Sequence, residues 1–87
     1  MTDTDLASLT TRIRNILKQH GKIPTDIAAL SDTADLYSSG LTSQASVALM
    51  LALEGEFEIE FPDALLNRKT FESVAAIRGV VTKLLEG

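Results

Sequence analysis

The hydrophobic and polar positions of this chain predict helices at both of its ends. Apolar residues recur there at steps of three and four, which is the spacing of one face of an α-helix. The first segment predicts a helix over about residues 4–19, ended near Gly21, with apolar positions at Leu6, Leu9, Ile13, Ile16 and Leu17. The last segment predicts a helix that begins between Thr70 and Ser73, with apolar positions at Val74, Ile77, Val81, Leu84 and Leu85. Each helix is expected to bury one face against a shared core.

A further helix is predicted over residues 43–57, in the middle of the chain. Its apolar positions form a band wider than a single stripe: Val47, Leu49, Met50, Leu51, Leu53 and Phe57. A helix this apolar is normally central to a small bundle, and we expect that position for it. Thr42 and Ser43 both have a side-chain oxygen suited to cap its first turn.

Residues 21–42 show no sustained period and predict a long loop, marked by Pro24 and Gly40. Long loops are uncommon in compact domains and are usually functional or disordered. Thr25 and Asp26 are suited to begin a single helical turn within it. Its apolar residues are expected to anchor the loop to the core, and they are Ile23, Ile27, Leu30 and Leu36.

The segment 57–61 alternates apolar and polar residues, which is the pattern of a strand. No other segment alternates to pair with it, so we expect a turn that buries its three apolar side chains. A short helix is predicted from Pro62 to about residue 68, with Leu65 and Leu66 facing inward. The chain is thus expected to form one all-α domain over residues 1–87, a small four-helix bundle of three main helices and one short helix with a long first loop.

Size and composition agree with a helical core and restrict the chemistry. A chain of 87 residues buries only about 60–65% of its unfolded surface. The absence of cysteine removes disulfides and thiolate–metal sites. The net charge of −4 is uneven, because residues 43–66 hold five acids and no base. An acidic middle argues against a nucleic-acid partner, which requires a basic stripe. It fits either a partner with a basic docking face or an ordinary solvated surface.

Membrane insertion and catalysis find little support. No apolar run reaches the roughly 20 residues that span a bilayer, and the acidic N-terminus lacks a signal-peptide start, so a cytoplasmic location is expected. His20 is the single histidine, and no Gly-x-Ser-x-Gly elbow accompanies it. Neither zinc-ligand spacing nor a calcium loop is present. The sequence therefore predicts that the chain is not an enzyme.

One serine differs from the others by its position. Ser43 opens the most apolar helix and directly follows Gly40, Leu41 and Thr42. A helix N-terminus offers unpaired N–H groups and a partial positive charge, which favour a phosphate attached there. Taken alone this signal is weak, because a serine at a helix start is usually only a cap.

Residues 35–63 resemble the acyl and peptidyl carrier proteins that bear 4′-phosphopantetheine. Their motif places a leucine and a glycine before the serine that opens the second helix. Apolar positions, a Leu-Glu pair, a phenylalanine and a Pro-Asp turn follow. The residues in register here are Leu36, Gly40, Ser43, Val47, Leu53, Glu54, Phe57, Phe61, Pro62 and Asp63. The similarity extends across all four helices and implies that Ser43 is the attachment site.

The resemblance also implies a mechanism and a set of partners. A phosphopantetheinyl transferase, using coenzyme A and magnesium, would join the arm to Ser43. The arm supplies the thiol that this cysteine-free chain lacks, and it holds a cargo as a thioester between a cargo-loading ligase and downstream acceptor enzymes. Partners are expected to dock on the start and outer side of the second helix, at Leu41, Thr42, Gln44, Val47, Ala48, Leu51 and Glu54.

Departures from the family pattern suggest a dedicated carrier. Thr42 stands where the family usually has aspartate, and Gln44 stands where it usually has leucine. Ala45, Ala48 and Gly55 occupy positions that are often acidic in fatty-acid carriers. The neutral second helix is similar to that of stand-alone aminoacyl carrier proteins, which small ligases related to seryl-tRNA synthetases charge with an amino acid.

Three alternatives to an aminoacyl carrier remain at this point. The nearest is a specialised acyl carrier of lipid or secondary-metabolite synthesis. The others are a helical interaction module without an arm and a subunit of an enzyme. We expect a monomer, because the apolar stripes suffice only for an internal core.

Overall fold

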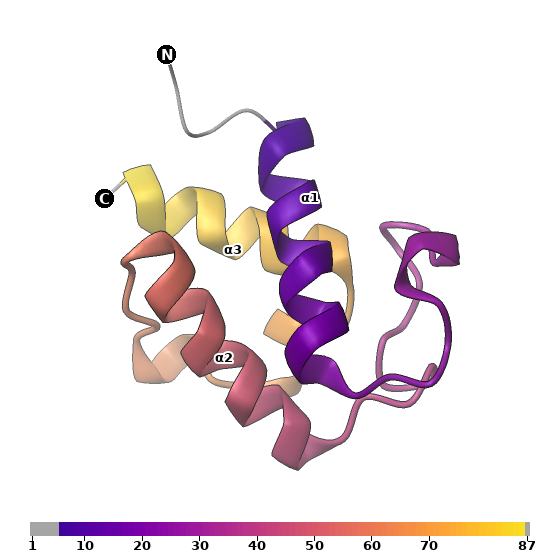
Figure 1. The fold of residues 1–87 in the computed structure, drawn as a ribbon. Coiled ribbons are helices and arrows are strands. Elements are labelled where there is room, and N and C mark those ends of the chain that lie inside the picture. Colours follow the sequence, from indigo (N-terminus) through magenta and orange to yellow (C-terminus); the bar gives the residue numbers. More distant parts are fainter. Residues whose placement is uncertain (1–5, 87) are drawn as a thin grey trace.

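Three α-helices form the frame of the protein in a computed structural model that describes residues 6–86 (Figure 1). They are α1 (Leu6–Ile16), α2 (Ser43–Phe57) and α3 (Val74–Glu86). No described residue lies in a strand, and no described helix is long and apolar enough to cross a membrane. The predicted all-α fold with three main helices is confirmed. The predicted start of the first helix near residue 4 lies outside the described residues.

The first helix continues beyond its predicted end. A π-helical turn, η1 (Leu17–Gly21), directly follows α1, and Lys22 then takes a left-handed conformation with φ of 54°. The prediction of an end near residue 19 was therefore short by two residues. Leu17 and Gly21 are both buried, and η1 packs against α2, so tertiary contact extends the helix here.

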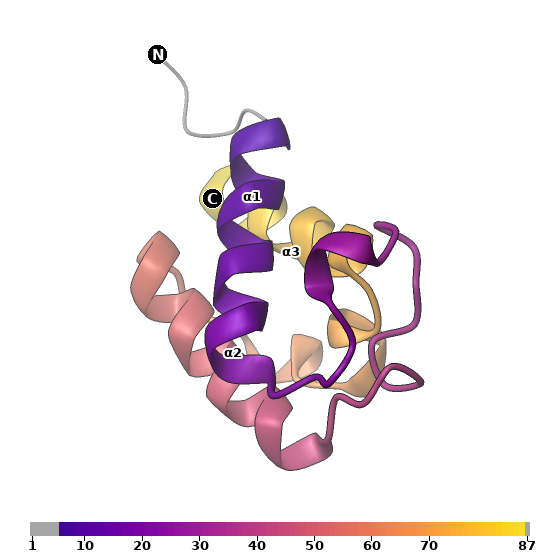
Figure 2. The ribbon, with the colours of Figure 1, turned by 45° about the vertical axis from the view of Figure 1, so that its right-hand side comes forward.

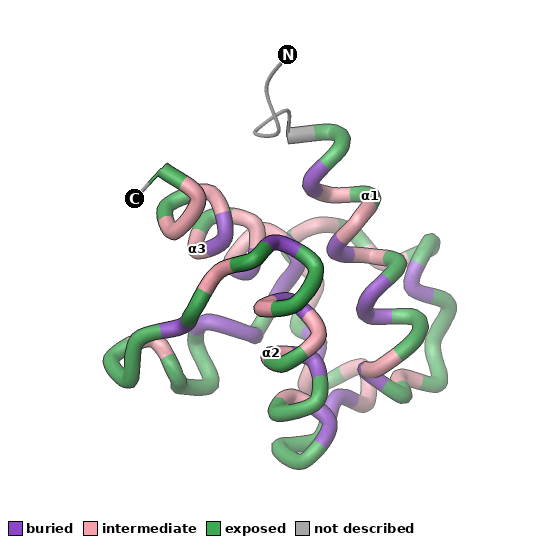
Figure 3. Tube along the Cα trace, turned by 60° about the vertical axis from the view of Figure 1, so that its left-hand side comes forward, coloured by how far each residue is buried: buried purple, intermediate pink, exposed green. Residues whose placement is uncertain are grey.

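The core lies where the three helices meet, and Figure 3 shows the buried positions on their inner sides. On α1 and α3 the buried residues repeat at steps of three and four, as the sequence predicts. On α2 they form one narrow stripe: Ala45, Leu49, Leu53 and Phe57. The other side of α2 faces solvent, and Val47 and Leu51 are 55% and 58% exposed. Of the wide apolar band predicted for α2, only this one stripe is therefore fully buried.

The segment after α2 is a turn, as predicted. Glu58 takes a left-handed conformation with φ of 54° and ends the helix. Phe57 and Phe61 are buried and Ile59 is partly buried against the core. The Glu54 carboxylate holds the turn by accepting the backbone N–H of Phe61 at 3.0 Å.

The predicted short helix is present as two separate 3₁₀ turns, η3 (Asp63–Leu65) and η4 (Arg68–Phe71). Asn67 breaks the run, because its side chain caps η4 by accepting the backbone N–H of Thr70. Leu65 packs against the core as expected. Leu66 does not, since it lies between the two turns and is 44% exposed.

The long loop between α1 and α2 lies along one side of the bundle, as Figure 2 shows. Its four predicted anchors are confirmed: Ile27 and Leu36 are buried, and Ile23 and Leu30 pack against the core. A short 3₁₀ turn, η2 (Ile27–Ala29), begins one residue after Asp26, whose carboxylate caps it.

An ionic anchor, which the sequence pattern does not reveal, also fastens this loop. Asp32 accepts hydrogen bonds from Arg14 of α1 at 2.6 Å and from Arg78 of α3 at 2.9 Å. The hydrogen bond from Arg78, followed by that from Arg14, holds the pKa of Asp32 below its ordinary value. The same loop residue thus joins two helices that are far apart in sequence.

Candidate functional site

Ser43 is the first residue of α2 and lies at the positive end of the helix dipole. Thr42 precedes it in an extended conformation and is the N-cap, because its hydroxyl accepts the backbone N–H of Ala45 at 3.0 Å. Of the two predicted caps, the structure therefore selects Thr42. This choice leaves the side chain of Ser43 exposed and free of the capping role.

The loop that leads into Ser43 is fixed by hydrogen bonds within residues 35–41. The Asp35 carboxylate accepts the N–H of Tyr37 at 3.0 Å and the hydroxyl of Ser38 at 3.0 Å. The hydrogen bond from the Ser38 hydroxyl is the main reason that the pKa of Asp35 lies below its ordinary value. Leu41 closes the loop by donating its N–H to the Leu36 carbonyl at 2.9 Å.

Gly40 is required in this loop for two separate reasons. Its φ of 125° belongs to a region that side chains rarely adopt. A Cβ at this position would also lie 2.5 Å from Cδ of Pro24, closer than van der Waals contact permits. The loop therefore reaches Ser43 along a path that only glycine allows.

The Ser43 hydroxyl differs from its neighbours in having no hydrogen-bond partner among the described residues. Residues 31–73 contain six serines, and in the described structure the hydroxyls of the other five all take part in a hydrogen bond. The closest example is Ser46, whose hydroxyl donates to the Ser43 carbonyl at 2.6 Å. The hydroxyl of Ser8 on α1 likewise has no partner within residues 6–86, but it does not border the pocket described next.

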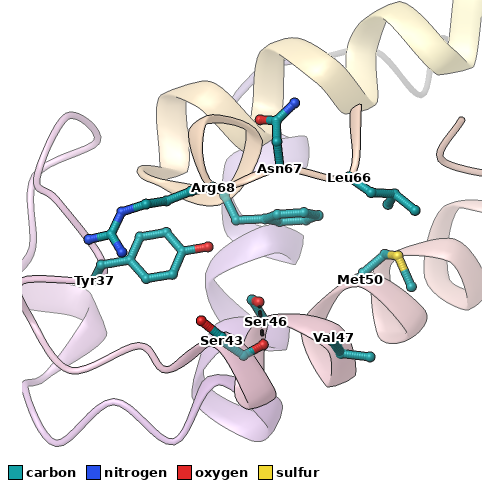
Figure 4. A pocket seen from close by; sticks show the side chains of 9 residues that line it. Tyr37, Ser43, Ser46, Val47, Met50, Leu66, Asn67 and Arg68 are labelled. Atoms are coloured by element: carbon teal, nitrogen blue, oxygen red, sulfur yellow. Dashed lines mark hydrogen bonds between the residues drawn. The ribbon is translucent and has the colours of Figure 1, made fainter. Parts of the chain in front are cut away.

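A pocket of about 450 Å³ opens beside Ser43, between α2 and the turns that precede α3 (Figure 4). Its polar lining comes from Tyr37, Ser43, Ser46, Asn67 and Arg68, and its apolar lining comes from Val47, Met50, Leu66 and Phe71. The Arg68 guanidinium stacks on the Tyr37 ring, with the Cζ atom 4.1 Å from the ring centroid. The Ser43 hydroxyl thus borders a pocket with both polar and apolar walls. Such a pocket suits a flexible chain that also has both polar and apolar groups.

The described residues offer no catalytic or metal-binding arrangement around this hydroxyl. They contain no group of three or more His, Cys, Asp or Glu side chains placed to hold a metal ion. His20 lies in η1, and its side chain makes no hydrogen bond to any other described residue.

Comparison with known proteins agrees with this geometry. Residues 9–77 match a family model described as a phosphopantetheine attachment site. The chain belongs to this family of carrier domains. The resemblance seen in the sequence is thereby confirmed, and so is the prediction that the chain is not an enzyme. The covalently attached cofactor of the carrier is 4′-phosphopantetheine.

The relatives of this carrier include an aminoacyl carrier protein. An aminoacyl carrier protein of Agrobacterium fabrum (strain C58 / ATCC 33970) is 53% identical over 75 residues, which are 86% of this chain and 90% of that protein. A carrier protein from Agrobacterium tumefaciens was crystallised with an engineered Bradyrhizobium japonicum glycine:[carrier protein] ligase and ATP. That structure matches with a TM-score of 0.84 and 51% identity over 86% of this chain and 97% of the other.

A further relative was solved in solution. This structure of an Agrobacterium tumefaciens protein matches with a TM-score of 0.72 and 51% identity, over 90% of this chain and 94% of the other. At these sequence identities, the relatives support both the fold of the carrier and its membership of the family.

The predicted docking residues divide into two groups. Thr42, Gln44, Val47, Ala48 and Leu51 are all exposed on the start and outer side of α2. The other two are less accessible. Leu41 is only 4% exposed because it belongs to the core, and the Glu54 carboxylate is used by the turn that follows α2.

Sequence reasoning missed the wall of the pocket opposite α2. That wall consists of Leu66, Asn67, Arg68 and Phe71, with Tyr37 at one end. These residues come from segments about thirty positions apart and share no periodic pattern, so only the folded chain brings them together. The expectation of a monomer assumed that the core uses all of the apolar stripes. The side chains of Val47, Leu51 and Leu66 are exposed, so this assumption does not hold.

Proposed function

We propose that Ser43 carries the 4′-phosphopantetheine arm and that the protein is an aminoacyl carrier, charged by an amino acid:carrier-protein ligase. The observation that carries this proposal is the Ser43 hydroxyl, which is exposed, has no partner among the described residues and borders the pocket. A transferase can reach such a hydroxyl without first breaking a hydrogen bond of the folded protein.

The surroundings of Ser43 fit the arm. The start of α2 favours the negative charge of a phosphodiester, and no acidic residue lies in the first turn of the helix. The pocket offers hydroxyl, amide and guanidinium groups beside apolar side chains, which suits a chain containing both amide groups and methyl groups. The bound arm supplies a terminal thiol, which holds the cargo as a thioester.

The role of the protein's own residues is to present the arm. Thr42 caps α2 and fixes its first turn, and Gly40 and Leu41 fix the direction from which the loop enters. The frame below them is rigid because Leu49 and Leu53 are fully buried. The attachment point is therefore held in one orientation while the arm remains free to move between partner enzymes.

The outer face of α2 is the proposed docking surface, made of Thr42, Gln44, Val47, Ala48 and Leu51. It is neutral and partly apolar, so it suits a partner with a complementary apolar patch rather than a strongly basic one. The aminoacyl carrier subtype is supported by the 53% identical relative and by the ligase complex of the related carrier. We further propose that a phosphopantetheinyl transferase and the ligase both act on the carrier in the cytoplasm.

Intact-mass measurement after incubation with coenzyme A, magnesium and a broad-range transferase tests the attachment site. The wild type is expected to gain one arm and Ser43→Ala none. Ser46→Ala is the matched control, because this serine borders the same pocket one turn later on α2, and it is expected to gain one arm. A mass gain in Ser43→Ala would refute the assignment.

The cargo class requires a second measurement. The modified carrier is offered free amino acids or fatty acids with ATP and a candidate ligase, and the thioester is identified by mass. We expect the thioester to carry an amino acid that is small enough for a ligase of the glycine-activating type. Loading by fatty acids alone would instead favour a specialised acyl carrier.

A further inference from the structure

Tyr37 is held rigidly at the edge of the pocket. Its backbone N–H donates to the Asp35 carboxylate at 3.0 Å, and its carbonyl accepts the N–H of Gly40 at 3.2 Å. The Arg68 guanidinium covers one face of its ring at 4.1 Å from the centroid. The side chain therefore bridges the loop before Ser43 and the opposite wall of the pocket.

The polar end of this rigid side chain is unused. Figure 4 shows the Tyr37 ring beside Ser43 with its hydroxyl directed towards the pocket, and the hydroxyl has no hydrogen-bond partner among the described residues. A partly buried tyrosine hydroxyl usually finds a partner. Arg68 is in none of the ion pairs between described residues, although its charge also acts on the Asp35 carboxylate and helps to lower the pKa of that group.

We propose that Tyr37 is a positioning residue for the arm, and that its hydroxyl donates a hydrogen bond to the phosphodiester on Ser43. Arg68 holds the ring in place and adds positive charge on the same side of the pocket. This inference rests on the proposed attachment of the arm to Ser43.

The phosphodiester is the appropriate acceptor for chemical reasons. It is an anion that accepts hydrogen bonds and donates none, and it is the first group beyond the Ser43 oxygen. Hydrogen bonds to a charged acceptor are stronger than neutral ones. One such bond at the root of the arm biases the arm towards the pocket without closing it off from partner enzymes.

The chain supplies a matched control for the stack. The Arg12 guanidinium lies over the Phe57 ring at a similar distance, 4.3 Å from the centroid, but it also pairs with the Glu56 carboxylate and borders a different pocket. Arg12→Gln removes a stack of this kind away from Ser43, whereas Arg68→Gln removes the one beside it. Tyr37→Phe keeps the ring and removes only the hydroxyl.

The experiment uses the arm-bearing forms of the wild type and of these three variants. Intact mass verifies that each carries one arm, and circular dichroism verifies that each is folded. The ³¹P resonance and the nuclear Overhauser contacts between ring 37 and the arm are then recorded. In Tyr37→Phe the equilibrium between the contacting and the free arm, followed by these signals, is expected to shift about ten-fold or more towards the free arm, the effect of losing one hydrogen bond to a charged group.

The variants are expected to rank in a definite order. In Tyr37→Phe the ³¹P resonance should move towards that of the free phosphodiester. Arg68→Gln should shift it in the same direction by a smaller amount, and Arg12→Gln should match the wild type.

Each contrary result has a separate meaning. An arm-bearing Tyr37→Phe with the ³¹P resonance and contacts of the wild type would overturn the inference and leave the attachment to Ser43 intact. A Tyr37→Phe that gains no arm, beside a wild type that does, would also overturn it, because the hydroxyl would then serve the transferase. A wild type that gains no arm would defeat the proposed function itself.

Discussion

Replacing Gly40 by alanine tests how the loop delivers Ser43 to the start of α2. The substitution meets two costs. A side chain at φ of 125° stores about 1–3 kcal/mol of backbone strain. The new Cβ, 2.5 Å from Cδ of Pro24, adds about 1–3 kcal/mol of overpacking.

The sum of these costs, about 2–6 kcal/mol, is large for this protein. A chain of this length has a free energy of unfolding of about 4–13 kcal/mol. A domain of this size loses about 4–8 °C of melting temperature per kcal/mol. Thermal unfolding followed by circular dichroism should therefore show Gly40→Ala melting at least about 8 °C below the wild type.

Gly55→Ala is the matched control for this measurement. Gly55 lies in the interior of α2, is exposed, and has nothing within 4 Å of an added Cβ. Alanine should stabilise the helix there by about 0.5–1 kcal/mol, because glycine loses more backbone entropy on folding. The two Gly-to-Ala changes are thus expected to have opposite signs.

A second variant separates the two costs at Gly40. Pro24→Ala removes Cγ and Cδ, so the double variant Pro24→Ala/Gly40→Ala should recover part of the loss while the backbone strain remains. If the losses in the free energy of unfolding of the two single variants simply add in the double variant, the overlap between the new Cβ and Cδ of Pro24 contributes nothing. If Gly40→Ala unfolds within about 0.5 kcal/mol of the wild type, the reasoning on both costs is refuted.

Two further predictions concern stability. Asp32→Asn should lower the free energy of unfolding by about 0.5–1 kcal/mol at pH 7, after allowance for screening at a partly exposed site. The contacts with Arg78 and Arg14 lower the pKa of Asp32 in the folded protein. Their stabilisation is therefore present above the unfolded pKa of about 3.9 and is lost as the pH falls through the folded pKa. Urea unfolding at pH 7 and below pH 3 checks this, and an equal deficit at both pH values would contradict it. Thr42→Ala should lower the free energy of unfolding by about 0.5–2 kcal/mol, because the α2 cap is lost, whereas Thr42→Asp should retain the cap. Equal melting temperatures of the two variants would show that the hydrogen bond from Ala45 contributes little.

Local patterns in the sequence were sufficient for much of the fold. The buried faces of α1 and α3 follow from apolar steps of three and four, because those steps place side chains on one side of a helix. The bounds of α2 followed from its apolar run and from the two candidate caps, Thr42 and Ser43, at its start. The turn at 57–61 followed because a single alternating segment has no partner strand to pair with.

The candidate site was also largely visible in the sequence. Ser43 could be singled out because it opens α2 and because Gly40 precedes it at the spacing of the carrier motif. The structure adds the reasons: Gly40 passes Pro24 too closely for a side chain, and Thr42 takes over the cap, which leaves the Ser43 hydroxyl free.

The remaining features depend on contacts between distant segments, which no local pattern encodes. A helix with as wide an apolar band as α2 has several faces that it can bury, and only the positions of α1 and α3 decide that Leu49 is buried and Val47 exposed. The extension of the first helix to Gly21 depends on packing against α2. The pocket beside Ser43 exists only because the turn at residues 66–71 comes to rest opposite α2. The sequence alone thus predicted the helices and singled out Ser43 as the candidate attachment serine, and the tertiary structure decided which faces are buried and what surrounds that serine.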